Sequence, residues 1–183
     1  MVRTRPIEPP TAPLTDGTVT LRPRRESDLD ALAEASHDPE ARRWLDDEPM
    51  DEQARRTGVA RADEAWRSGT AAPLTIADAV TDEPVGMINL QFCSDTEATI
   101  AYGVFPQCRG RGIAPRAVRL LAQWALSDLK LEQVILEADE RNTASIRVAE
   151  KCGFHGLGTR TETVGDSAQR SIVVFALRDS STG

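Results

Sequence analysis

Residues 102–115 read YGVFPQCRGRGIAP, and the organisation of the whole chain follows from this stretch. Upstream, residues 98–104 (ATIAYGV) are short and apolar, a pattern that predicts a buried strand. Downstream, apolar residues recur at helical spacing as far as Leu129, with Pro115 in the opening turn, where proline is tolerated. Pro106 has no N–H group for a sheet ladder, so we expect the strand to part from its neighbour there.

The loop between strand and helix has the features of an anion site. Gly110 and Gly112 allow a sharp turn and leave backbone N–H groups uncovered at the helix N-terminus, where the helix dipole adds positive charge. Four arginines crowd the same place: Arg109, Arg111, Arg116 and Arg119. The combination predicts a bound phosphate. A P-loop would need Gly-Lys-Ser/Thr, and a dinucleotide fingerprint would need a small residue in place of Pro115, so neither nucleotide motif fits.

The pattern Gln107-x-x-Gly110-x-Gly112 resembles the pyrophosphate loop of the GNAT superfamily of acyl-CoA-dependent N-acyltransferases. The similarity extends over residues 98–154 and is greatest to the branch that includes the ribosomal-protein N-terminal acetyltransferases. It rests on Tyr102, the RGRGIA loop, Asn142-x-x-Ser145 and the KCGF segment at 151–154. It implies an acetyl-CoA-dependent N-acetyltransferase that moves an acetyl group to a primary amine, for instance a protein or peptide N-terminus, by direct attack on the thioester.

The resemblance also implies a set of acetyl-CoA-binding residues. We expect a V-shaped gap after Val104, caused by Pro106, in which pantetheine pairs with the strand. An N–H group near Val104 or Phe105 would polarise the thioester carbonyl. Cys108 would be an exposed thiol beside the cofactor, and Asn142 would both cap a helix and contact the cofactor. The full set is Val104, Phe105, Gln107, Cys108, Arg109, Gly110, Arg111, Gly112, Ile113, Ala114, Asn142 and Ser145.

Catalytic roles follow from the same resemblance. Ser145 would protonate the departing thiolate, because a hydroxyl can donate to sulfur without being ionised. Many relatives carry a carboxylate at the position of Thr99, which cannot accept the amine proton at neutral pH. Glu162, Glu97 or a water chain would then act as the general base, with Glu162 ranked first. Both carboxylates are also consistent with ordinary solvated strand charges.

On the acceptor side, we expect Trp44, Asp46, Asp47 and Tyr102 to contact the substrate. Five carboxylates fall within residues 46–52, on a connection that the resemblance places over the acceptor groove. Such a stretch would steer a cationic amine, although a solvated, helix-capping acidic segment has the same composition. For Trp44, a buried anchor remains an equal alternative to a groove wall.

The composition of the chain disfavours several other classes of partner and location. The net charge of −7 disfavours a nucleic-acid partner. No stretch approaches the ~20 apolar residues of a membrane span, and the N-terminus lacks a signal-peptide core, so we expect no membrane partner. Three widely spaced cysteines indicate a reduced cytoplasmic location. The two histidines lack a second ligand at metal-binding spacing, so no metal is expected. A homodimer is left as an option.

We predict one α/β (α+β) domain at residues 18–183 after a loose lead-in at 1–17. The resemblance implies a GNAT-type mixed, mostly antiparallel sheet of about seven strands, with a parallel central pair splayed at the cofactor site and about four helices. A crossover connection makes residues 133–138 parallel to the Tyr102 strand. Predicted strands are 18–22, 73–80, 84–93, 98–104, 133–138, 158–164 and 170–177; predicted helices open near Ser27, Asp51, Pro115 and Asn142.

Two alternatives remain open at this stage. One is a small-molecule amine or aminoglycoside acetyltransferase, because nothing in the sequence selects the acceptor. The other belongs to a different class, a non-catalytic acyl-CoA-binding module, and is motivated by Thr99 at the position where relatives often carry the base.

Overall fold

The computed structural model describes residues 5–44, 48–164 and 168–178. Within these ranges the chain forms eight strands, five α-helices and two short 3₁₀ turns. The strands are β1 (Leu14–Thr15), β2 (Val19–Pro23), β3 (Ala71–Asp78), β4 (Pro84–Phe92), β5 (Glu97–Val104), β6 (Gln133–Asp139), β7 (His155–Val164) and β8 (Ala168–Arg178). The helices are α1 (Leu29–Ser36), α2 (Pro39–Trp44), α3 (Glu52–Ser68), α4 (Ile113–Ser127) and α5 (Thr143–Lys151), with 3₁₀ turns η1 (Glu26–Asp28) and η2 (Pro106–Cys108).

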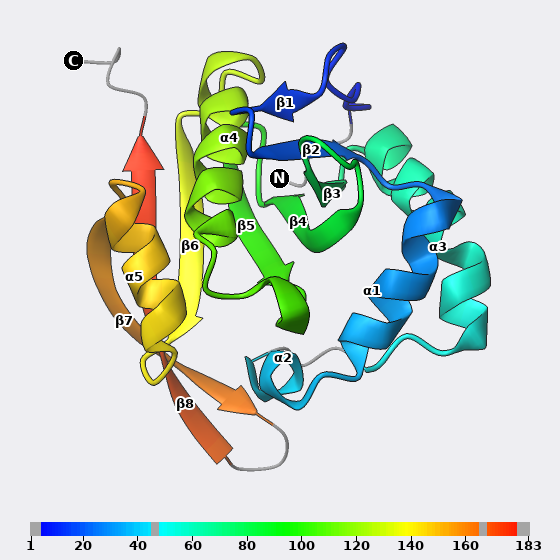
Figure 1. Ribbon diagram of the computed structural model, residues 1–183. Coiled ribbons are helices and arrows are strands. Elements are labelled where there is room, and N and C mark those ends of the chain that lie inside the picture. Colours follow the sequence, from blue (N-terminus) through cyan, green and yellow to red (C-terminus); the bar gives the residue numbers. More distant parts are fainter. Residues whose placement is uncertain (1–4, 45–47, 165–167, 179–183) are drawn as a thin grey trace.

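All eight strands belong to one sheet, in the order β1-β2-β3-β4-β5-β6-β8-β7. Each neighbouring pair is antiparallel except β5 and β6, which are parallel and are connected by α4. The prediction of a mixed, mostly antiparallel α/β sheet with one parallel pair is confirmed. Figure 1 shows α4 and α5 side by side over the middle of the sheet, with α1, α2 and α3 on the other side of the molecule.

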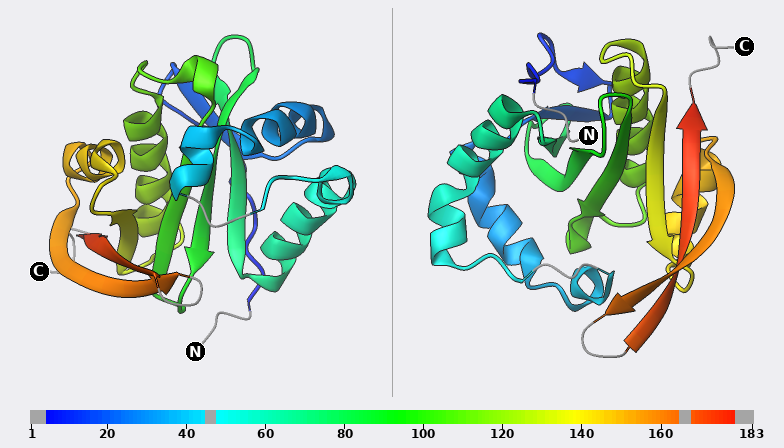
Figure 2. Two further views of the ribbon diagram at one scale, coloured as in Figure 1. Left: turned by 90° about the horizontal axis from the view of Figure 1, so that it is seen from below. Right: turned by 180° about the vertical axis from the view of Figure 1, so that it is seen from behind.

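Two apolar clusters hold these layers together. The larger one lies between α4 and the sheet, and includes Trp66 and Trp124, whose rings meet edge to face at 6.2 Å between centroids. The smaller one joins α1 to the other face of the sheet through Leu29, Leu32 and Phe105. The two views of Figure 2 show the sheet between the pair α4 and α5 and the pair α1 and α3. The sheet is therefore covered by α4 on one face, while α1 covers the other face near the end of β5 and leaves Glu137 of β6 exposed.

Two short elements were not expected. Strand β1 lies in the segment predicted to be loose, and near it Ile7 is buried and donates its N–H to the Trp66 carbonyl (2.9 Å). A two-residue strand is too short to produce an alternating pattern, so the sequence did not indicate it. The stretch expected to be a loop before Pro49 contains α2, whose first turn is capped by the Asp38 carboxylate on the Ala41 N–H (2.8 Å). The domain limits themselves stay a prediction.

The other helix ends follow local chemistry. As predicted, Asp51 caps α3 by accepting from the Ala54 N–H (2.6 Å), and Gly69 ends it in the left-handed conformation. The expected cap of α1 at Ser27 is wrong: Ser27 lies inside η1, α1 has no side-chain cap, and the Asp28 carboxylate accepts from the Arg25 N–H (2.9 Å) at the start of η1. Asp28 has a larger role than capping, because its carboxylate is buried.

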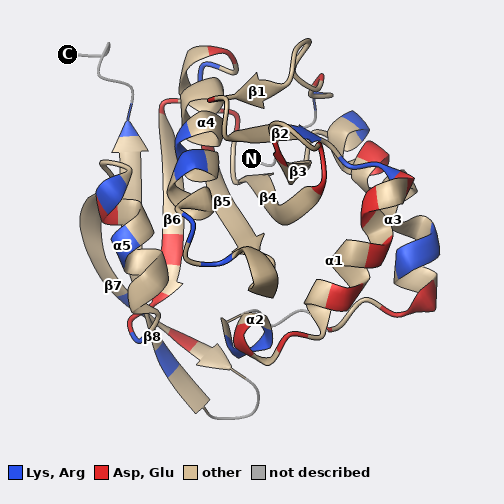
Figure 3. Ribbon diagram, viewed as in Figure 1, with Lys and Arg blue, Asp and Glu red and all other residues tan. Residues whose placement is uncertain are grey.

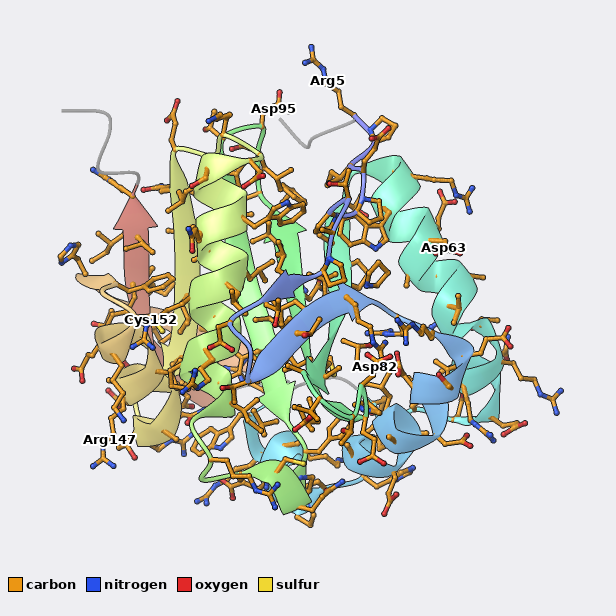
Figure 4. All side chains as sticks on the ribbon, turned by 45° about the horizontal axis from the view of Figure 1, so that its top comes forward. Arg5, Asp63, Asp82, Asp95, Arg147 and Cys152 are labelled. Carbon is orange, nitrogen blue, oxygen red and sulfur yellow. The ribbon has the colours of Figure 1, made fainter. Side chains whose placement is uncertain are left out.

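Asp28 is the centre of a buried polar network. Both of its oxygens accept hydrogen bonds from the Arg22 guanidinium (2.7 and 2.9 Å), and one also accepts from the Thr75 hydroxyl (2.9 Å). Arg22 continues to Asp82 in the turn between β3 and β4 (2.7 Å; Figure 4). The network therefore ties β2, η1, β3 and the β3–β4 turn together beneath α1.

The same contacts set the ionisation of Asp28. Burial by itself would raise the pKa of its carboxyl, but the hydrogen bonds from Arg22, the Arg25 backbone and Thr75 outweigh it and lower the pKa. A lowered folded-state pKa stabilises the fold above the unfolded-state pKa, and this contribution is lost as the pH falls through the folded-state value.

We predict that Asp28→Asn destabilises the protein by roughly 3–5 kcal/mol, because it removes the buried charge partner of Arg22 and leaves only the exposed Asp82 to pair with it. Asp30→Asn is the matched control, since Asp30 is an exposed acid two positions away whose pairing with Arg55 is solvated; it should cost less than about 1 kcal/mol. Denaturant unfolding at neutral pH measures both. Equal losses in the two variants would contradict the role given to Asp28.

Candidate functional site

The parallel strands β5 and β6 pair over four residues and then separate. Their last paired residues are Ile100 and Leu136, although β5 continues to Val104 and β6 to Asp139. Figure 1 shows the two strands diverging toward their carboxyl ends. We call this the fork: residues 101–104 on one arm and residues 137–139 on the other. The splayed pair was predicted, but its place was wrong. The separation begins at Ala101 rather than at Pro106, and β5 stays paired with β4 as far as Val104.

The fork leaves backbone groups of β5 without a strand partner on the β6 side. Phe105 donates its N–H to the Val85 carbonyl (2.9 Å), which fixes the phase of the β4–β5 ladder. Because antiparallel strands alternate between bonded and non-bonded pairs, the polar groups of Tyr102 and Val104 point away from β4, into the fork. The Phe105 N–H is therefore engaged, which leaves the Val104 N–H as the amide that an acyl oxygen could reach.

The glycine loop begins at the end of the same arm. Gly110 and Gly112 have φ of 74° and 71°, and Gly112 is the N-cap of α4. A Cβ built on either glycine would meet nothing within 4 Å, so the space above the loop is open. Backbone N–H groups at a helix N-terminus that faces open space are suited to bind an anion, and the phosphate at this loop stays a prediction.

The arginines around this loop are less available than expected. Arg109 donates to the Asp38 carboxylate (2.6 Å) and to the Val104 carbonyl (3.2 Å), and Arg116 pairs with Asp16 (2.7 Å). Arg119 donates to the Lys151 carbonyl (2.7 Å). An open hollow of about 480 Å³ lies along α4, between the β1–β2 turn and the end of α5, and its lining includes Asp16, Gly112, Arg116, Arg119 and Lys151. Figure 3 shows basic residues along this loop and α4, and acidic residues along α1.

Burial also changes the expected roles inside the loop. The Cys108 side chain is buried and belongs to the main core cluster, so the prediction of an exposed thiol beside the cofactor is wrong. The Ile113 side chain is buried too, and only its backbone can face a ligand. Gln107 lines a smaller hollow of about 260 Å³ between η2 and α1, next to Glu34 and Asp38. Ala114 is half-buried in the opening turn of α4, and Arg111 is exposed in the loop.

Helix α5 brings two predicted residues to the fork. Asn142 caps the helix by accepting from the Ser145 N–H (3.1 Å), as expected for this residue type. The Ser145 hydroxyl in turn accepts a hydrogen bond from the Tyr102 hydroxyl of β5 (3.2 Å). Tyr102 was predicted on the acceptor side, but its side chain packs toward the core between β5 and α5. Three predicted site residues from distant parts of the sequence thus meet at one place.

Neither carboxylate predicted as a base is arranged to be one. Glu97 lies at the paired end of β5, about 13 Å before Ala101 at ~3.3 Å per residue, and accepts from the Gln133 amide. Glu162 accepts from Arg170 (2.7 Å) and lies near Arg160 (3.5 Å). The Arg170 hydrogen bond is the main cause that lowers the pKa of Glu162. Glu162 also lies in β7, which the strand order places two strands beyond β6 and therefore away from the fork.

Glu137 is a fork residue that the sequence analysis missed. It directly follows Leu136, the last residue of β6 that pairs with β5, and its neighbours Leu136 and Ala138 are buried on the α4 side. Strand alternation places the Glu137 side chain on the opposite face of the sheet. There it accepts two hydrogen bonds from the Arg160 guanidinium (3.2 and 2.8 Å). No pattern in the sequence marks where two strands cease to pair, so nothing distinguished this glutamate.

Part of the predicted acceptor side lies outside the described residues, namely Asp46 and Asp47. Trp44 is half-buried at the end of α2 and donates its ring N–H to Glu40 (3.1 Å), while the Arg43 guanidinium lies 5.2 Å from the ring centroid. Its role as groove wall or anchor stays a prediction.

Metal-binding groups and membrane-spanning helices are absent from the described residues. In residues 5–44, 48–164 and 168–178 there is no group of three or more histidine, cysteine, aspartate or glutamate side chains that could hold a metal ion. No helix in this part of the chain is both long enough and apolar enough to cross a membrane.

The sequence was then compared with known proteins. Residues 18–155 match the family model described as acetyltransferase (GNAT) domain. Among curated relatives, the probable N-acetyltransferase YjcK of Bacillus subtilis is 39% identical over 67 residues, which is 37% of each chain. The uncharacterized N-acetyltransferase p20 of Bacillus licheniformis is 26% identical over 143 residues, covering 76% of this chain and 80% of p20. The first of these matches thus spans little more than a third of the relative.

Solved structures extend the likeness to nearly the whole chain. RimL, a ribosomal L7/L12 alpha-N-protein acetyltransferase in complex with coenzyme A, superimposes with a TM-score of 0.78 at 20% identity, covering 91% of this chain and 96% of that one. Spermidine N-acetyltransferase from Vibrio cholerae, in complex with CoA and spermine, gives 0.78 at 15% identity, covering 90% and 98%. At these identities the likeness shows the fold.

We predict that Gly110→Ala and Gly112→Ala each raise the dissociation constant for CoA at least about tenfold, equivalent to roughly 1.4 kcal/mol. The added methyl group would occupy the open space above the loop, where a phosphate must approach the N–H groups. Isothermal titration calorimetry with CoA measures this.

Gly153→Ala is the matched control. Gly153 ends α5 at φ 81°, also with nothing within 4 Å of an added Cβ, so it carries the same backbone strain of about 1–2 kcal/mol away from the loop. All three variants should lose similar thermal stability, while CoA affinity falls only in the loop variants. Equal affinities in all three would show that the glycines only shape a turn.

Proposed function

This chain belongs to the acetyltransferase (GNAT) family, and from that premise we propose that it transfers the acetyl group of acetyl-CoA to a primary amine. The proposal rests on three features that lie together at one point of the sheet: the fork, the glycine loop and the Asn142 cap of α5. The fork offers backbone groups to pantetheine, the loop offers N–H groups to pyrophosphate, and the family supplies the donor. The hollow bordered by Arg116, Arg119 and Lys151 would take the phosphorylated nucleotide end.

The donor would lie along β5 with its thioester at the open end of the fork. The Val104 N–H would bind the carbonyl oxygen, and its stabilisation grows as the tetrahedral oxyanion forms. The amine nitrogen would attack the carbonyl carbon, forming the N–C bond, and the C–S bond would then break with its electron pair passing to sulfur. Ser145, at the other arm, would donate a hydrogen bond to that sulfur.

The amine proton must leave on the face of the sheet opposite Ser145. Glu137 is the carboxylate on that face at the first unpaired position of β6. We assign it the proton, taken directly or through a water, in preference to Glu162 and Glu97. Its carboxylate is paired with Arg160 of β7, and this ion pair would have to loosen when the proton is accepted.

For the acceptor we propose a protein or peptide N-terminal amine, in keeping with the resemblance to the ribosomal-protein branch and with the fold shared with RimL. A small polyamine is the second candidate, favoured by the net charge of −7 and by the equally similar spermidine enzyme. A non-catalytic acyl-CoA-binding role is the alternative of a different class. The oligomeric state stays a prediction.

Incubation with acetyl-CoA and an amine panel, with release of free thiol as the signal, separates these possibilities. The panel contains short peptides with free and with blocked N-termini, spermidine and an aminoglycoside. Turnover on free but not on blocked peptides is the expected result. Turnover on spermidine alone would select the second candidate, and CoA binding without turnover on any acceptor would support the binding module.

We predict that Glu137→Gln lowers kcat about 10²–10⁴-fold while the dissociation constant for acetyl-CoA stays unchanged. Glu162→Gln is the matched control, because it changes an arginine-paired glutamate on the same face of the sheet but in β7, away from the fork, and should reduce kcat only a few-fold. Steady-state kinetics with the best acceptor of the panel measures both. A larger loss in Glu162→Gln would reverse the assignment.

A further inference from the structure

In the described part of the chain, a side-chain hydrogen bond links the β5 arm of the fork to α5, the helix that follows the β6 arm. Tyr102 lies in β5 two residues beyond Ile100, the last residue paired with β6. Ser145 lies in the first turn of α5, the helix that follows β6. The Tyr102 hydroxyl donates to Ser145 Oγ across 3.2 Å. The bond therefore lies where the two strands have already separated and no backbone pairing holds them.

This bond determines where the proton of Ser145 can point. A serine hydroxyl has one hydrogen to donate and lone pairs that accept. Because Oγ accepts from Tyr102, its own hydrogen must be directed elsewhere, and no protein group in the described ranges accepts it. The Ser145 backbone is also fixed, since its N–H donates to Asn142 Oδ1 (3.1 Å). The serine is thus held with its hydrogen directed away from Tyr102.

The tyrosine is suited to remain the donor of the pair. Burial raises the pKa of the Tyr102 hydroxyl, the hydrogen bond to Ser145 lowers it, and Cys152 at the end of α5 raises it again; the net shift is upward, so the group stays protonated at physiological pH. Cys152, labelled in Figure 4, is itself held neutral because burial raises the pKa of its thiol, while Arg119 of α4 acts on it in the opposite sense. These are the titratable and charged groups that act on the hydroxyl pair.

We propose that Tyr102 is a positioning residue that polarises the Ser145 hydroxyl and directs its hydrogen toward the CoA sulfur. The inference rests on the proposed function, since it needs CoA in the fork. When the N–C bond forms and the C–S bond breaks, the electron pair passes to sulfur, and Ser145 stabilises the resulting thiolate. The tyrosine gives up no proton in this step; the proton that eventually reaches sulfur is the one lost by the amine.

The test titrates the thiol of bound CoA and needs no acceptor. Thiolate absorbance is followed against pH in the protein–CoA complex, and the same titration with S-methyl-CoA is subtracted, because that ligand has no thiol and the protein's cysteines then cancel. We expect the wild type to lower the pKa of the bound thiol relative to free CoA. Tyr102→Phe should raise it by about one unit, as expected for a weakened hydrogen bond to a charged acceptor.

Ser145→Ala should raise the thiol pKa at least as far, and the double variant should go no further than Ser145→Ala, because the tyrosine acts through the serine. Thr99→Val is the matched control: it removes a hydroxyl from the same strand, on the opposite face, and should leave the value unchanged. CoA affinity and thermal unfolding are measured for each variant to show that the site is intact.

The outcomes distinguish a failure of the proposed function from a failure of the role given to Tyr102. Failure of the wild type to bind CoA would overturn the proposed function and this inference with it. CoA binding with the same thiol pKa in wild type and Tyr102→Phe would overturn the inference alone. If Tyr102→Phe proved unfolded, Ser145→Ala would decide, since an unchanged thiol pKa there removes the group through which Tyr102 is proposed to act.

Discussion

The end of pairing between β5 and β6 is the constraint on which the rest of the site depends. Up to Ile100 and Leu136 the strands form an ordinary parallel ladder inside a sheet that α4 covers on one face. Beyond that point, the backbone polar groups of Tyr102 and Val104 have no strand partner on that side. Backbone N–H and C=O groups inside a protein need hydrogen-bond partners. At this site the partner is either water or an extended ligand that pairs with the strand. The fork therefore presents an unpaired strand edge within the sheet, as the proposed pairing with pantetheine requires.

Keeping the fork open requires each arm to be anchored elsewhere. The β5 arm remains paired with β4 to its end and continues into η2, whose Cys108 is buried in the main core. The β6 arm remains paired with β8 as far as Asp139 and then turns into α5 under the Asn142 cap. The hydrogen bond from Tyr102 to Ser145 joins the β5 arm to α5. The opening is a rigid feature of the fold, which fits a site that must hold a thioester in one orientation.

The sequence predicted those parts of the site that are controlled by local chemistry. Gly110 and Gly112 had to be left-handed and uncovered, Asn142 had to cap a helix, and the crossover through α4 had to make β5 and β6 parallel. The sequence predictions failed where contacts between distant segments determine the structure. The start of the fork at Ala101, the burial of Cys108 and the arginine partners of Glu162 depend on packing between distant segments. Glu137 was missed for the same reason, since its position matters only once the end of pairing is known.

Arg109 connects the glycine loop to the helix that precedes the expected acceptor side. Arg109 donates both to the Val104 carbonyl, at the edge of the fork, and to Asp38, which caps α2. The same hydrogen bond from Arg109 is the main cause that lowers the pKa of Asp38, so the aspartate remains an ionised partner at neutral pH. A phosphate at the loop would compete with Asp38 for this guanidinium, because both are anions seeking the same donors. Arg109 thus links the end of β5 at the edge of the fork to the residue that caps α2, so two segments far apart in the sequence share one guanidinium.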